Sequence, residues 1–182
     1  MSRQETEVAT SKAGKYLTFE LGNEAFALEI TKVQEIIGIL PVTRVPKLPD
    51  FVRGVINLRG KVIPVIDLRR KFGFGAREDT ARTCIIVAQI NRDDRQVITG
   101  ILVDEVCEVL DVAADQIDAA PDFGAAVNTD FIPGMGRIGD RVVMLLDVDR
   151  VLSSGEVDSV ELIGTPGRAR LGDSGAQKGV AP

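Results

Sequence analysis

The chain has 182 residues, of which 45% are hydrophobic, so it can form one domain of ordinary size or two small ones that share a core. It carries 22 basic and 27 acidic residues, for a net charge of −5, and it has seven Phe, one Tyr and no Trp. Nucleic acid is therefore not an expected partner, because its binding requires a basic surface and is often supported by stacking aromatic side chains.

Histidine is absent from the whole sequence. A Ser-His-Asp triad, a Cys-His pair and a zinc ion held by histidine are thereby excluded. Histidine also carries out most acid–base catalysis near neutral pH, so we expect no enzyme activity, no metal and no cofactor. The two cysteines, Cys84 and Cys107, lie in apolar strand-like runs, and we interpret both as buried reduced thiols.

Residues 1–14 are polar and are predicted to be flexible, and no apolar run is long enough to span a membrane. From residue 15 onward, alternating apolar residues and frequent turn signals predict β-strands. In chain order these strands occupy residues 16–21, 25–30, 33–39, 52–58, 62–67, 83–90, 97–103, 106–110 and 142–148. Short helices are expected only at residues 68–72, 112–117 and 148–152. Residues 153–182 are rich in Gly and Ser and are predicted to be mostly disordered, which leaves residues 15–152 as the folded body.

Two segments between the strands are expected to be turns. The polar residues 91–96 should form a hairpin loop. Gly134, Gly136 and Gly139 match the GxGxxG pattern of dinucleotide-binding loops, but the residues that follow indicate a strand instead of the helix which that site requires. We therefore interpret residues 134–139 as a glycine-rich hairpin turn.

The sequence also contains a weak internal repeat. Four pairs of like residues are separated by one constant offset: Phe51 and Phe131, Gly54 and Gly134, Val62 and Val142, and Asp67 and Asp147. Val33 and Val106 recur in the same order at a slightly shorter offset. A constant order with nearly constant spacing predicts two similar five-stranded units of about 70 residues each. Packed side by side as small barrels, they would bury more surface than either unit alone and leave a groove between them.

Charge is unevenly distributed between the two halves. Residues 44–71 hold eight basic side chains against two acidic ones, whereas residues 100–122 hold seven acidic side chains and no basic one. This difference favours two surfaces suited to different partners. Arg59 lies beside a hairpin tip, and its place in the repeat is taken by Gly139, so the turn itself does not require an arginine. A binding role and a solvated turn residue both remain open for Arg59.

Five stretches of the chain closely resemble the CheW family of chemotaxis coupling proteins: residues 16–22, 30–37, 51–72, 100–110 and 131–152. The resemblance implies an all-β fold of two side-by-side five-stranded SH3-like barrels within residues 15–152. It also implies a scaffold without catalysis, which bridges the cytoplasmic tip of a methyl-accepting chemotaxis receptor and the regulatory domain of a CheA-type histidine kinase. Such a protein is expected in the cytoplasm at membrane-associated receptor arrays, without insertion into the membrane.

The family pattern further implies two groups of binding residues. Positions that match the receptor side are Ile30, Val33, Glu35, Gly54 and Arg59, and positions that match the kinase side are Asp104, Val106 and Val109. An apolar strip can accept the apolar face of a helix, while charged neighbours would fix its orientation. Core packing is the competing interpretation for the four residues of these groups that are Ile or Val.

Two other functions remain open on the sequence alone. The first is a CheW-like adaptor of a non-chemotaxis array that controls surface motility or second-messenger synthesis. The second is an enzyme or a small-ligand barrel that uses the groove between the barrels, although the sequence offers no convergent acid–base set for it.

Overall fold

The computed structural model describes residues 13–75, 78–92, 94–120 and 131–152. The predicted disordered tail, residues 153–182, and residues 1–12 of the predicted flexible N-terminus lie outside these ranges. The elements, in chain order, are β1 (Gly14–Leu21), β2 (Glu24–Glu29), the 3-10 helix η1 (Ile30–Lys32), β3 (Val33–Gly38), β4 (Val52–Leu58), β5 (Lys61–Asp67), α2 (Leu68–Lys71), β6 (Cys84–Arg92), β7 (Arg95–Val103), β8 (Glu105–Val112), the 3-10 helix η2 (Ala114–Gln116), β9 (Ile117–Asp118), β10 (Gly134–Ile138), β11 (Arg141–Leu146) and α3 (Val148–Val151). None of these helices is long and apolar enough to cross a membrane.

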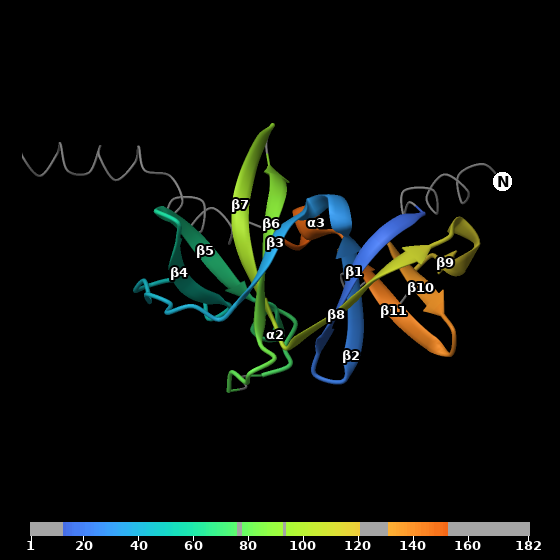
Figure 1. The fold of residues 1–182 in the computed structure, drawn as a ribbon, viewed down its shortest axis with the longest axis horizontal. Coiled ribbons are helices and arrows are strands. Elements are labelled where there is room, and N and C mark those ends of the chain that lie inside the picture. Colours follow the sequence, from blue (N-terminus) through green and yellow to red (C-terminus); the bar gives the residue numbers. More distant parts are fainter. Residues whose placement is uncertain (1–12, 76–77, 93, 121–130, 153–182) are drawn as a thin grey trace, which may run out of the picture.

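The strands form two sheets, each curled into a small barrel, and the two barrels stand side by side (Figure 1). The six-stranded sheet has the order β8-β1-β2-β11-β10-β9, and the five-stranded sheet has the order β3-β6-β7-β5-β4. In Figure 1 the blue strands β1 and β2 accordingly lie with the orange strands β10 and β11, while β6 and β7 lie with β4 and β5. The prediction of an all-β fold with two adjacent small barrels is confirmed.

Neither barrel corresponds to a single sequence repeat, which corrects the expectation of two separate five-stranded units. Strands β1–β5 come from the first half of the chain and β6–β11 from the second, yet each sheet takes strands from both halves. Parallel contacts join the halves, because β2 pairs with β11 in one sheet and β7 pairs with β5 in the other. The chain therefore has to cross between the barrels to complete either of them.

The sequence repeat is nevertheless visible as a repeat of local contacts. The backbone N–H of Asp67 donates to the carbonyl oxygen of Phe51 at 2.7 Å, and that of Asp147 donates to Phe131 at 2.9 Å. Each aspartate side chain then caps the short helix that follows it, α2 or α3, by accepting from a backbone N–H of the first turn. The positions that recur at a constant offset in the sequence are thus structurally equivalent.

The largest hydrophobic core lies between the barrels. It contains Phe19 and Leu28 from the six-stranded sheet and Ile86 and Ile101 from the five-stranded sheet, all of them almost completely buried. Two smaller clusters fill the individual barrels. Burying one such side chain contributes about 1.5–3 kcal/mol, so the shared cluster makes the relative placement of the barrels part of the fold.

Both predicted turns are shorter than expected. The hairpin at residues 91–96 is tight, because β6 and β7 continue to a turn at Asp94, whose φ is 64°. The glycine-rich residues are mostly strand, since Gly134–Ile138 forms β10 and the turn begins at Gly139, whose φ is 60°. Glycine composition alone therefore overestimated the turn, because the pairing of β10 with β11 stabilises extended backbone through most of it.

Other boundaries and one burial prediction also differ. The strand predicted to reach residue 148 ends at Leu146, because Asp147 caps α3. The short elements η1 and β9 were not predicted from the sequence. The interpretation of two buried thiols is wrong for Cys107, which is exposed on β8, whereas Cys84 is partly buried. Strand β8 is an edge of its sheet, where Cys107 and Val109 face solvent.

Candidate partner-binding surfaces

The structure brings together the two charged residues that the sequence assigned to the receptor side. Arg59 lies at the turn between β4 and β5 with φ 52°, and its Nη1 and Nη2 donate to Oε2 and Oε1 of Glu35 at 2.8 Å each. Glu35 lies on β3. Strands β3 and β4 are the two edges of the five-stranded sheet. This bidentate ion pair therefore links β3 to the end of β4, where the barrel closes.

The pair is asymmetrically exposed. The side chain of Glu35 is 29% exposed and that of Arg59 is 70% exposed, so the guanidinium is open to a partner while the carboxylate is held beneath it. The side-chain hydrogen bond from Arg59, and to a smaller extent its charge, lowers the pKa of Glu35. The same hydrogen bond raises the pKa of Arg59. Both groups are therefore held in their charged forms, with the guanidinium plane fixed in orientation.

Ile30 and Val33 begin the segment that leads to this pair. Ile30 opens η1 and Val33 opens β3, and both side chains are partly buried against the core between the barrels. Core packing thus applies to part of each side chain and leaves only part of its surface accessible. Ile36, farther along β3, is more exposed at 41% and was not singled out from the sequence.

Gly54 is buried in β4, and the structure shows a packing reason for glycine there. Its φ is 141°, and a Cβ atom at this position would lie 2.2 Å from the carbonyl oxygen of Thr43. Thr43 and Val55 form a backbone bridge beside it, with N···O distances of 2.8 and 2.9 Å. Gly54 therefore lets the segment around Thr43 pass close to β4 and shapes the barrel from within.

Asp104, predicted on the kinase side, is engaged in a contact inside the protein. Its Oδ2 accepts from Nη1 of Arg69 in α2 at 2.7 Å and from the backbone N–H of Gly22 at 2.7 Å. The side chains of Asp104 and Arg69 are only 16% and 14% exposed. The contact joins α2, the β1–β2 turn and the start of β8, and sequence analysis had not identified Arg69 as its partner.

Val106 and Val109 lie on β8, the exposed edge of the six-stranded sheet. Val106 is partly buried against the core between the barrels, whereas Val109 is 47% exposed. Val109 occupies the place in the second half of the repeat that Ile36 has in the first, so the two edge strands present similar apolar positions. The structure places these valines on the opposite barrel from Glu35 and Arg59.

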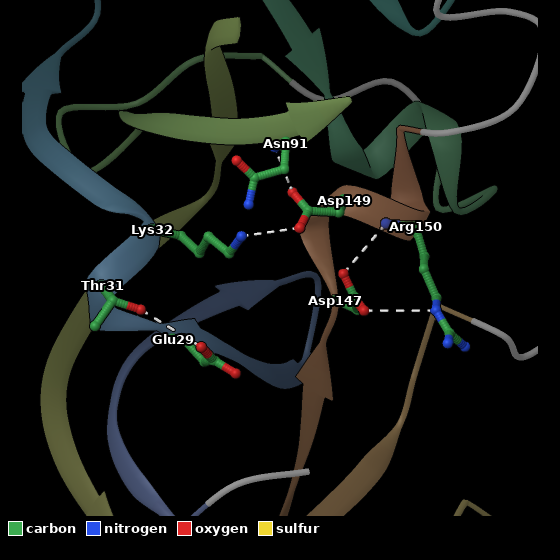
Figure 2. A network of polar contacts seen from close by, with 7 residues as sticks. All are labelled: Glu29, Thr31, Lys32, Asn91, Asp147, Asp149 and Arg150. Carbon is green, nitrogen blue, oxygen red and sulfur yellow. Dashed lines mark hydrogen bonds and ion pairs between the residues drawn. The ribbon is translucent and has the colours of Figure 1, made fainter. Parts of the chain in front are cut away.

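A further polar junction joins α3 to η1 and β6 (Figure 2). Asp149 in α3 accepts from Nζ of Lys32 at 2.8 Å and from the backbone N–H of Asn91 at 2.8 Å. Asp149 lies in the short helix expected at residues 148–152, but it was not singled out from the sequence. The helpful signal is its place in the repeat, because it corresponds to Arg69, the polar residue that joins elements in the first half.

Two curled sheets with a shared core, each with an edge strand that exposes an apolar side chain, define a double β-barrel protein of the SH3-like class. Across the described residues, no group of His, Cys, Asp and Glu side chains is arranged to hold a metal ion. The family model of the CheW-like domain matches residues 15–156. The chain belongs to the CheW-like domain family.

Individual relatives agree with this assignment. The chain is 42% identical over 147 residues to the chemotaxis protein CheW of Klebsiella aerogenes, covering 81% of this chain and 86% of that protein. It is 34% identical to the chemotaxis protein CheW of Bacillus subtilis, covering 76% and 86% of the two chains. The crystal structure of the scaffolding protein TtCheW from Thermoanaerobacter tengcongensis superposes with a TM-score of 0.69 at 30% identity, covering 79% of this chain and 95% of that one.

Proposed function

We propose that the protein is a non-catalytic scaffold of chemotaxis arrays, which couples the cytoplasmic tips of chemoreceptors to a CheA-type histidine kinase. The observation that carries the proposal is the match to the CheW-like domain through residues 15–156, together with relatives that are named chemotaxis proteins CheW. The absence of histidine from the sequence agrees with a role without acid–base catalysis. The site of action is then the cytoplasmic face of a receptor array.

The receptor side of this proposal is the β3 edge of the five-stranded barrel. Arg59 presents an exposed guanidinium whose plane is fixed by Glu35, which suits it to an acidic or carbonyl group on a helical receptor tip. The accessible parts of Ile30 and Val33 would accept apolar residues of that helix. Gly54 contributes through the shape of the barrel, since it is buried.

The kinase side of the proposal is the β8 edge of the six-stranded barrel. Val109 offers an exposed apolar contact, and Val106 offers the accessible part of a side chain that also packs inward. Asp104 supports this edge from within through its contact with Arg69. Because the two edges belong to different barrels, a receptor and a kinase regulatory domain can occupy them at the same time.

The test is ATP-dependent autophosphorylation of a CheA-type kinase in a mixture with a receptor fragment, with and without this protein. We expect strong stimulation that requires all three components. A matched reaction that contains Arg59→Glu should show reduced stimulation, although the variant remains folded by circular dichroism. If the folded wild-type protein neither stimulates the kinase nor binds either partner, the proposed function is wrong.

A further inference from the structure

Two polar junctions, each between the barrels, have the same construction. The β8 clamp consists of Arg69, Asp104 and the backbone N–H of Gly22, and both donors meet Oδ2 of Asp104 at 2.7 Å. The β3 clamp consists of Lys32, Asp149 and the backbone N–H of Asn91 (Figure 2). In it, Lys32 donates to Oδ2 of the aspartate and Asn91 to Oδ1, at 2.8 Å each.

The clamps join equivalent elements of the repeat. Arg69 is the second residue of α2 and Asp149 the second residue of α3, and these two helices follow the equivalent capping aspartates. Lys32 directly precedes β3, and Asp104 directly precedes β8. In both clamps an aspartate also accepts from the backbone of a hairpin, either β1–β2 or β6–β7.

The charges of the two clamps are reversed. In the β8 clamp the helix carries the cation and the segment before the edge strand carries the anion, while in the β3 clamp the helix carries the anion. Each clamp still pairs a cation with an anion, because the helix contributes Arg69 in the β8 clamp and Asp149 in the β3 clamp. The two clamps thus join equivalent elements with opposite polarity, and Lys32 and Asp104 differ by one residue in the register of the repeat.

Both pairs are considerably shielded from solvent. The side chains of Arg69 and Asp104 are 14% and 16% exposed, and those of Lys32 and Asp149 are 23% and 28% exposed. Exposed surface ion pairs contribute little, but removal of one partner from a shielded pair leaves a charge without its counterpart and is costly. Each clamp can therefore hold its segment in one arrangement.

We propose that the two clamps are positioning devices for separate partner-binding edges. Lys32 and Asp149 hold the start of β3, while Arg69 and Asp104 hold the start of β8. Given the proposed function, on which the partner assignment depends, the β3 clamp sets affinity for the receptor and the β8 clamp sets affinity for the kinase. Since the clamps share no residue, the two affinities can be changed separately.

The experiment compares Lys32→Met with Arg69→Met in the full chain, because each removes the cation and keeps a long apolar side chain. Lys32→Arg and Arg69→Lys are the matched controls that keep the charge. Affinities for a receptor cytoplasmic fragment and for the CheA regulatory domain are measured separately by calorimetry. Amide hydrogen exchange in β3 and β8 is followed without partners.

We expect Lys32→Met to weaken receptor binding by about threefold to tenfold, with kinase binding unchanged, and Arg69→Met to do the reverse. Exchange should accelerate in β3 for the first variant and in β8 for the second. The charge-keeping controls should restore most of each affinity. If Arg69→Met does not fold, Asp104→Asn replaces it, because an amide oxygen can still accept from Gly22.

Equal loss of both affinities in either variant, or no loss in both, would overturn the proposal. So would faster exchange throughout the protein instead of in one edge strand. If the wild-type chain binds neither partner, the proposed function and the partner assignment are both wrong. The exchange pattern would then still decide whether each clamp holds its own strand.

Discussion

Gly54 and Thr43 approach each other so closely that no side chain fits between them. A Cβ atom on Gly54 would lie 2.2 Å from the carbonyl oxygen of Thr43 and 2.9 Å from its carbonyl carbon. The approach coincides with a register irregularity between Val52 and Gly54 in the pairing of β4 with β5. The family pattern placed Gly54 among receptor-side residues, whereas its burial points to an indirect contribution through barrel shape.

Gly54→Ala is expected to lower the free energy of unfolding by about 2–4 kcal/mol, because the methyl group meets backbone atoms that have no room to move. Gly60→Ala is the matched control, since Gly60 also has a positive φ, 86°, but has no atom within 4 Å of its Cβ position. Its cost should be about 1 kcal/mol, from backbone conformation alone. Urea denaturation measures both, and equal costs would contradict the steric explanation.

Charge reversal at the barrel edge is expected to separate binding from folding. Arg59→Glu places two carboxylates together at the exposed tip, so affinity for a receptor fragment should fall while the melting temperature changes little. Arg82→Glu is a matched control, because Arg82 also forms an exposed ion pair, with Glu105 of β8 at 3.2 Å. Normal receptor affinity of folded Arg59→Glu would remove Arg59 from the site.

The pKa of Glu35 gives a test of the same pair without any partner. Arg59 lowers this pKa from its ordinary value of 4.5, so the folded state binds the proton more weakly than the unfolded state. The stabilisation by this ion pair is present above pH 4.5, and it is lost as the pH falls through the lower pKa of Glu35 in the folded state. In Arg59→Ala the pKa of Glu35 should rise toward its ordinary value, measured by NMR titration of the carboxyl carbon. An unchanged pKa would show that the pair does not form in solution.

The sequence predicted local structure better than it predicted association. Alternation located the strand Val52–Leu58 with both of its ends, because a half-buried strand repeats its environment every two residues. The repeat spacing also identified Asp67 and Asp147 as equivalent, which their two helix caps confirm. These features depend on neighbouring residues, which a single sequence displays directly.

Contacts between distant residues were not predictable in the same way. The exchange of strands between the two barrels follows from the pairing of β2 with β11 and of β7 with β5, and hydrophobic alternation is the same whichever strand is the partner. Asp104 belongs to an acidic run that favoured a partner surface, but the fold brings Arg69 to it. Lys32 and Asp149 are 117 residues apart, and neither belongs to a motif.

The exposed valine of the β8 edge is expected to matter for one partner only. Val109→Asp introduces a charge on a side chain that is 47% exposed, so it should weaken binding of the CheA regulatory domain without a large loss of stability. Ile36→Asp is the matched control on the β3 edge, at 41% exposure. It should leave kinase affinity unchanged. Similar losses of kinase affinity in the two variants would show that the kinase does not distinguish the edges.

Tyr16 provides a stability test at the other end of the pH range. Its side chain is 3% exposed, and burial, with a smaller effect of the nearby Glu29 charge, raises its pKa from 10.0 to about 12. The folded state therefore holds the phenol proton more tightly than the unfolded state, so this stabilisation is fully present below pH 10 and is lost as the pH rises to about 12.

Because Tyr16 is the only tyrosine in the sequence, tyrosinate absorbance reports its ionisation directly. We expect ionisation of the folded protein to be delayed relative to the protein in urea, where the ordinary pKa applies. Tyr16→Phe removes this proton, so its free energy of unfolding should fall less steeply between pH 10 and 12 than that of the wild type. Coincident titration curves in the folded and unfolded states would show that Tyr16 is open to solvent. They would also contradict the pairing of β1 with β2 at Tyr16 and Glu29.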